Sequence, residues 1–105
     1  MNSSLNHTIK AFKMSRDFNK ADQMRAYMKY KFEYLGIQSK LRNELSKDFL
    51  NEMRSTKVID WDLVWYLWEL DEREFQYLAL SYLDKMKDYL KKDDIHQIEK
   101  IIINK

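Results

Sequence analysis

The sequence contains no proline, and Gly36 is its only glycine. Tight β-turns and hairpins depend on these two residue types, because glycine reaches positive φ at no steric cost and proline presets the φ of a turn. Residues that favour helices, chiefly leucine, lysine, glutamate and methionine, are plentiful instead. The composition therefore predicts an all-helical chain.

The chain has 105 residues and no cysteine, which is the length of one modest domain without disulfides or thiolate metal sites. His7 and His96 are isolated, so we expect no metal and no cofactor. An apolar run of about 18 residues, which a membrane span requires, is missing. The N-terminus is too polar for a signal peptide, and we expect a cytoplasmic protein that does not enter membranes.

Apolar residues recur at steps of three and four in six segments, which predicts six amphipathic helices. Asn19 and Asp60 are expected to cap the second and fourth helices, and Gly36 to end the second in the left-handed conformation. Asp71 with Glu74 and Asp94 with Gln97 have the spacing of capping boxes. The predicted helices are residues 4–17, 20–35, 39–53, 61–70, 72–91 and 95–105, of which 72–91 is the longest.

Six helices with short connections fit a compact bundle or a stack of helical hairpins. The last helix favours the stack, because its isoleucines need a partner on the outer side. We therefore expect residues 1–105 to form a single helical-repeat domain of antiparallel hairpins, stacked as a HEAT-like (ARM-type) solenoid and truncated at its C-terminal end. The same isoleucines predict a homo-oligomer. They are Ile95, Ile98, Ile101, Ile102 and Ile103.

Tyr27, Tyr30 and Tyr34 follow one another at helical spacing, on a face next to the methionine and phenylalanine stripe of the second predicted helix. One interpretation places Tyr30 and Tyr34 in a core between two neighbouring helices. Tyr27 is a candidate for surface contact.

Positive charge is concentrated in the first half of the chain. Residues 1–59 hold 12 Lys or Arg and 6 Asp or Glu, a balance of +6, whereas residues 60–105 hold 7 and 11, a balance of −4. A basic half is typical of polyanion binding, because lysine and arginine neutralise phosphates. A merely solvated polar surface is the alternative.

Two stretches, YMKYKFEYLGIQ at residues 27–38 and LWELDEREFQYLAL at residues 67–80, resemble the AlkD-like family of bacterial DNA alkylation-repair glycosylases. The resemblance extends over essentially the whole chain and implies HEAT-like helical repeats. It also implies a partner, double-stranded DNA containing alkylated purines of the 3-methyladenine or 7-methylguanine type. In such enzymes a carboxylate stabilises the oxocarbenium-like sugar while the charged base leaves.

Carried over residue by residue, the resemblance places Tyr27 in the DNA cleft and Gln38 at the start of the helix that faces DNA. Ser39, Lys40 and Arg42 would follow onto the phosphate backbone. A helix N-terminus suits this role, because its free amides and positive dipole end favour an anion.

The family's catalytic aspartate lies in a segment with paired tryptophans that, by the resemblance, would follow the last residue of this sequence. We therefore name no catalytic residue, and we expect this chain to contribute DNA contacts without catalysing base release alone. Two other hypotheses remain open: a helical-repeat module for protein interaction or self-association, and general nucleic-acid binding without repair.

Overall fold

The computed structural model describes residues 3–104, and within this range the chain is all-helical with six α-helices, as the sequence predicted. Two short 3₁₀ helices precede the last α-helix. The elements are α1 (Ser3–Met14), α2 (Phe18–Tyr27), α3 (Ser39–Arg54), α4 (Trp61–Trp68), α5 (Arg73–Lys85), η1 (Lys87–Tyr89), η2 (Lys92–Asp94) and α6 (Ile95–Asn104).

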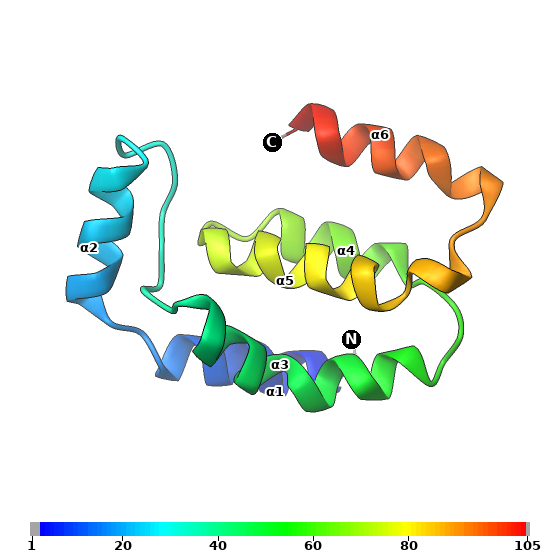
Figure 1. The fold of residues 1–105 in the computed structure, drawn as a ribbon, viewed down its shortest axis with the longest axis horizontal. Coiled ribbons are helices and arrows are strands. Elements are labelled where there is room, and N and C mark those ends of the chain that lie inside the picture. Colours follow the sequence, from blue (N-terminus) through cyan, green and yellow to red (C-terminus); the bar gives the residue numbers. More distant parts are fainter. Residues whose placement is uncertain (1–2, 105) are drawn as a thin grey trace.

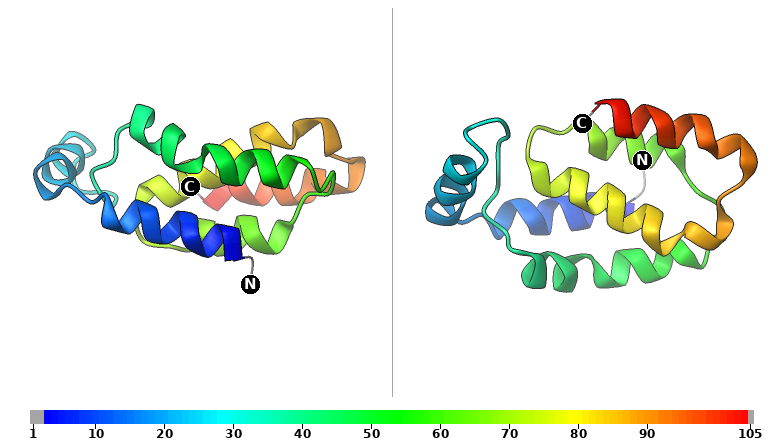
Figure 2. Two further views of the ribbon diagram at one scale, coloured as in Figure 1. Left: turned by 90° about the horizontal axis from the view of Figure 1, so that it is seen from below. Right: turned by 45° about the horizontal axis from the view of Figure 1, so that its top comes forward.

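The helices lie in successive layers (Figure 1). Helices α1 and α3 pack against each other in opposite directions, α3 packs on α5, and α4 and α5 form an antiparallel pair. Helix α6 lies beyond α4 and α5, while α2 stands apart at one end, across the direction of the other helices (Figures 1 and 2). This order of layers is consistent with a helical repeat.

The core forms where the apolar stripes of these layers meet. Phe12 of α1 stacks on Phe75 of α5 with ring centroids 5.7 Å apart, and Phe49 of α3 stacks on Tyr82 of α5 at 6.4 Å. These four side chains are almost completely buried. Aromatic pairs of this kind contribute beyond their buried area, so they fix α5 against both α1 and α3.

The predicted helix over residues 20–35 is wrong in its second half. Helix α2 begins after Asp17, whose side chain accepts a hydrogen bond from the Lys20 N–H, and it ends at Tyr27. Lys29 and Tyr30 then adopt left-handed conformations with φ of 57° and 61°. Hydrogen bonds to distant parts of the chain hold the following residues extended, and helical periodicity cannot reveal such bonds.

The early end of α2 places Tyr30 and Tyr34 in different surroundings. Tyr34 is buried, as one interpretation of the sequence placed it, whereas Tyr30 is 74% exposed and lies outside the core. Gly36 has the expected positive φ, 93°, but it lies within the extended segment instead of ending a helix.

Helix α5 is shorter than predicted, and α3, with 16 residues, is the longest helix. The chain leaves the α-helical path at Met86 and enters η1. The predicted Asp60 cap is confirmed, since its side chain accepts from the Leu63 N–H at 3.1 Å. Neither predicted capping box forms, because Glu74, Asp94 and Gln97 make long-range hydrogen bonds instead.

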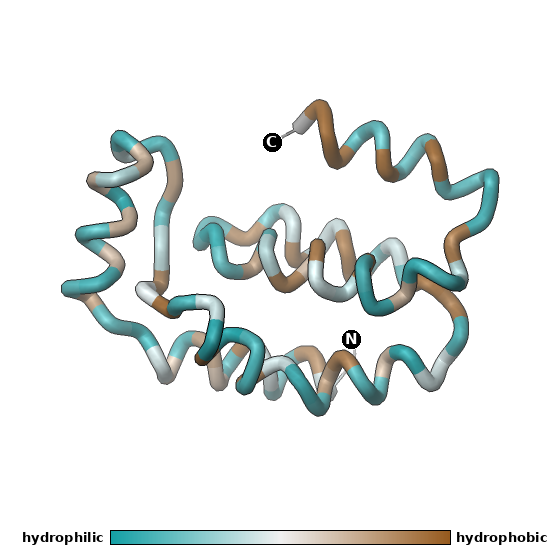
Figure 3. Tube along the Cα trace, in the orientation of Figure 1, coloured by the Kyte–Doolittle hydropathy of each residue, from teal (hydrophilic) through white to brown (hydrophobic). Residues whose placement is uncertain are grey.

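Helix α6 and the preceding η2 are held to α4 by two indole hydrogen bonds. Trp61 Nε1 donates to Asp94 Oδ1 at 2.9 Å, and Trp65 Nε1 donates to Gln97 Oε1 at 2.8 Å. Ile101 is buried against the core, but Ile102 and Ile103 are 72% and 83% exposed. The hydrophobic colour of the last turn in Figure 3 therefore marks a partly uncovered apolar end. No helix within residues 3–104 is long and apolar enough to cross a membrane.

Candidate nucleic-acid interface

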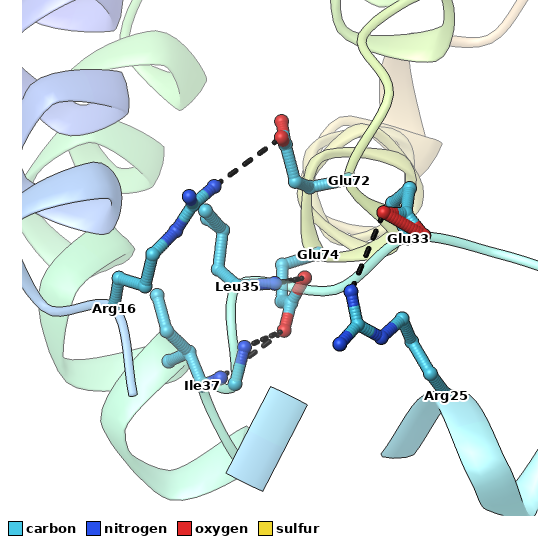
Figure 4. A network of polar contacts seen from close by, with 8 residues as sticks. Arg16, Arg25, Glu33, Leu35, Ile37, Glu72 and Glu74 are labelled. Carbon is cyan, nitrogen blue, oxygen red and sulfur yellow. Dashed lines mark hydrogen bonds and ion pairs between the residues drawn. The ribbon is translucent and has the colours of Figure 1, made fainter. Parts of the chain in front are cut away.

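The extended segment 31–38 connects α2 to α3 and is fixed by one buried carboxylate (Figure 4). Glu74 Oε1 accepts from the Leu35 N–H at 2.8 Å, and Oε2 accepts from the Gly36 and Ile37 N–H groups at 2.9 and 3.1 Å. Hydrogen bonds to a charged acceptor are stronger than neutral ones, and here they replace the helical bonds that the segment lacks.

Further backbone hydrogen bonds tie both sides of this segment to neighbouring elements. The Leu35 carbonyl accepts from the Asp17 N–H at 2.9 Å, and the Glu33 carbonyl accepts from the Arg73 N–H at 2.8 Å. Ion pairs from Arg25 to Glu33 at 3.5 Å and from Arg16 to Glu72 at 3.4 Å surround the same region (Figure 4). The segment is therefore a fixed link that sets where α3 begins.

Gly36 is required where the segment passes α2. A Cβ at this position would lie 2.1 Å from the Asp17 carbonyl oxygen and 2.9 Å from the Ala21 nitrogen. Both neighbours are backbone atoms that cannot rotate away, and the φ of 93° is also unfavourable for a residue with a side chain. The only glycine of the chain thus allows α2 and the start of α3 to approach each other.

A groove of 330 Å³ opens between α2, this segment and α5, and none of its lining residues is acidic. A second depression of 360 Å³ shares Lys20 and Gln38 with it and includes Lys40, but also Asp17 and Glu44. A polyanion would therefore meet less repulsion in the first groove, the one without carboxylates. That groove is lined by Lys20, Gln23, Met24, Tyr27, Met28, Tyr34, Gln38 and Tyr77.

Four of the five predicted contact residues lie at the rims of these two depressions or beside them. Tyr27 ends α2 and is 86% exposed, and it lines the first groove together with Gln38. Gln38 directly precedes α3 and makes no side-chain cap, so its amide group is not occupied by the helix terminus. Ser39 and Lys40 are exposed in the first turn of α3, and Lys40 lines the second depression.

Arg42, the fifth predicted residue, is half-buried instead of extending freely into solvent. Its guanidinium carbon lies 4.9 Å from the centroid of the Tyr77 ring, which is within the range of a cation–π contact. Burial lowers the pKa of Arg42, although an arginine remains charged at physiological pH. Tyr77 forms part of the first groove, so the structure brings Arg42 next to the groove through this ring.

Sequence reasoning missed Lys20, Tyr34 and Tyr77, which line the first groove, and Arg73, whose guanidinium contacts the ring of Tyr77. Arg73 and Tyr77 are four residues apart on α5, a spacing that places both on one helix face and could have pointed to them. Tyr34 was considered only as a core residue. Burial, together with the neighbouring Tyr77, raises its pKa to about 12, so its hydroxyl stays protonated and remains a hydrogen-bond donor.

Four acidic side chains around the first groove and the extended segment are engaged within the protein, whereas Glu44 in the second depression forms no ion pair within residues 3–104. Glu74 binds backbone amides, Glu72 and Glu33 form ion pairs with arginines, and Asp17 caps α2. A carboxylate committed in this way is poorly placed to stabilise a cationic transition state. The surface is suited to binding an anion by positive charge, aromatic rings and helix amides.

Fold and surface together define an all-helical protein with an aromatic groove free of carboxylates beside a helix N-terminus. The chain belongs to the family of DNA alkylation repair enzymes, whose model matches residues 8–105. A search of curated proteins found no match to the chain.

Proposed function

We propose that residues 1–105 form a single helical-repeat domain that binds the DNA backbone for a 3-methyladenine or 7-methylguanine type DNA glycosylase. Membership of the alkylation repair family supplies the substrate class, DNA with alkylated bases. The observation that carries the assignment is the first groove. The exposed ring of Tyr27 lines it together with the side chains of Lys20 and Gln38, and none of its lining residues is a carboxylate.

Each proposed contact has a physical reason. Tyr27 offers a large exposed ring that packs on deoxyribose, and Gln38 offers an amide group to phosphate oxygens. Ser39 and Lys40 stand at the N-terminus of a helix of 16 residues, where free amides and the dipole favour a phosphate. Arg42 adds a positive charge one turn further along α3. These contacts position a duplex without reading its sequence.

We assign no catalytic acid to this chain, because Glu74, Glu72, Glu33 and Asp17 are committed to backbone amides, ion pairs and a cap, and no observation marks another carboxylate for this role. The domain is expected to bind duplex DNA and to release no alkylated base by itself. Release of 3-methyladenine or 7-methylguanine from methylated DNA by the isolated chain would contradict this part of the proposal.

DNA binding is tested by fluorescence anisotropy with a short labelled duplex at several salt concentrations. Each phosphate contact adds about 0.9 to the slope of log K against log salt. We expect Lys20→Ala and Lys40→Ala each to reduce the slope by about that amount, and Lys100→Ala on α6 to leave it unchanged. Equal changes of the salt slope in all three variants would indicate a diffuse electrostatic attraction between protein and DNA. In a separate comparison, stronger binding of alkylated than of plain DNA would exclude general nucleic-acid binding.

Self-association is a second candidate function, favoured by the exposure of Ile102 and Ile103 on α6. Apolar side chains on one helix face are a common basis of subunit contacts. Sedimentation velocity at increasing concentration tests it: a dimer that Ile102→Glu dissociates would support it, and a monomer at all concentrations would exclude it.

A further inference from the structure

The five arginines of the chain fall into two groups. Arg16, Arg25 and Arg54 each form an ion pair with a carboxylate: Arg16 with Glu72, Arg25 with Asp22 and Glu33, and Arg54 with Asp88. Arg42 and Arg73 form none among residues 3–104, although both lie next to the groove. Their guanidinium groups contact aromatic rings instead.

The ring of Tyr77 joins these two arginines. Arg42 lies 4.9 Å and Arg73 lies 5.6 Å from its centroid, and Arg73 also stacks 4.1 Å above the ring of Phe32. Three parts of the chain, α3, α5 and the segment after α2, thus meet in one stack. A guanidinium held between rings loses conformational freedom before any ligand arrives, so binding costs less entropy.

Several donors in this stack have no acceptor within the described part of the chain. Arg42 Nε, Arg73 Nε and Arg73 Nη1 are enclosed and form no hydrogen bond. Enclosed donors without an acceptor are unfavourable and rare in native proteins, and a bound ion is one explanation for them. Glu74, the carboxylate that acts on Arg42, already accepts three backbone N–H groups, so its oxygens are not free to accept from these donors.

We propose that Arg42 and Arg73, oriented by the ring of Tyr77, bind one phosphate group together. Arginine suits this ligand because its planar set of donors matches phosphate oxygens. The phosphate is a phosphodiester of a DNA strand or a free phosphate. The inference rests on the proposed function in the case of DNA, and it adds Arg73 as a ligand and Tyr77 as a positioning residue.

NMR of the intact chain tests the site without any substitution. The enclosed Nε–H groups of Arg42 and Arg73 should be protected from exchange and give separate ¹⁵N signals. Inorganic phosphate and a short duplex are added in separate titrations. Shifts of both signals with phosphate alone identify a site for free phosphate, and shifts with the duplex alone identify a backbone phosphodiester. Arg73 signals that stay fixed in both titrations would overturn the inference.

Variants separate this inference from the proposed function. Arg73→Gln should weaken duplex binding about tenfold, the size of one lost charge-assisted contact. Arg54→Gln is the matched control, since Arg54 also lies over a tyrosine ring, 5.3 Å from Tyr89, but pairs with Asp88. If wild-type protein binds DNA and both variants behave alike, the two-arginine site is wrong while the proposed function stands. If the chain binds no DNA, the phosphate titration alone decides.

The role of Tyr77 is tested by two substitutions that leave the charge unchanged. Tyr77→Phe keeps the ring and should bind the duplex like the wild type, whereas Tyr77→Leu removes the ring and should weaken binding several-fold. The Arg42 and Arg73 Nε signals should lose their exchange protection in Tyr77→Leu only. Equal binding and equal protection in the two variants would show that the ring does not position the arginines.

Discussion

The Glu74 carboxylate accepts a hydrogen bond from the backbone N–H of Gly36 at 2.9 Å, although 38 residues separate the two. Through this bond and its two neighbours, α5 fixes the segment that leads into α3. The position of the α3 N-terminus, and with it the groove, depends on this contact.

Glu74→Gln should destabilise the fold by about 2 to 3 kcal/mol, because three backbone donors lose a charged acceptor and one of them faces an amide NH₂ group. Urea unfolding followed by circular dichroism measures the change. Glu99→Gln on the exposed side of α6 is the control and should alter stability by less than about 0.5 kcal/mol. Equal stability of the two variants would mean that the carboxylate does not hold the segment.

Gly36→Ala should destabilise the protein by at least about 2 kcal/mol, because the new Cβ would meet the Asp17 carbonyl and the φ of 93° is strained. Thermal unfolding measures this loss. Asn51→Ala, on the exposed face of α3, serves as the control. A Gly36→Ala protein with wild-type stability would show that α2 and the segment move apart at little cost.

Tyr27→Ala should separate DNA binding from stability. The ring is 86% exposed, so its removal should change the free energy of unfolding by less than about 0.5 kcal/mol. Duplex affinity should fall several-fold, because the ring forms part of the proposed contact surface. Tyr66→Ala, an exposed tyrosine on α4, is the control for affinity. An equal loss of affinity in both variants would contradict a specific role of Tyr27.

Stability should fall in alkali through Tyr34. Burial and the neighbouring Tyr77 raise the pKa of Tyr34 from 10.0 to about 12, so between these values the folded chain keeps a proton that the unfolded chain loses. The contribution is complete below pH 10 and disappears as the pH rises to 12, with a slope of at most about 1.4 kcal/mol per pH unit. Tyr34→Phe should unfold with a shallower dependence in this range, and absorbance at 295 nm should lose a late-titrating tyrosine. An unchanged titration curve would contradict the shift.

Asp94→Ala should loosen α6 without unfolding the rest. Asp94 accepts from Trp61 Nε1 at 2.9 Å and from the Lys91 N–H at 2.8 Å. Its loss therefore removes both a link to α4 and the hydrogen bond that caps the start of η2, just before α6. Amide hydrogen exchange should become faster in α6 by about tenfold, while α3 and α5 keep their protection. Asp93→Ala, an exposed neighbour, provides the comparison.

The resemblance directed attention to residues 27–38, but the geometry of this stretch had to come from the structure. The sequence pattern predicts the end of a helix and a turn for residues 27–38, yet most of them form an extended link. Glu74 was expected to cap a helix and instead binds that link. Both errors arise because local patterns describe bonds between near neighbours, whereas these bonds join residues almost 40 positions apart.

The sequence by itself determined that the chain is helical, because proline is absent, glycine occurs once and apolar residues recur at helical spacing. It also determined the Asp60 cap and the buried stripes, which depend on residues within a turn or two. Only the tertiary structure decided that α2 stops at Tyr27 and that Arg42 and Arg73 share the ring of Tyr77. Those features depend on charged groups and aromatic rings that come from α2, α3 and α5. These groups interact only after the helices have packed, so local sequence patterns cannot predict their interactions.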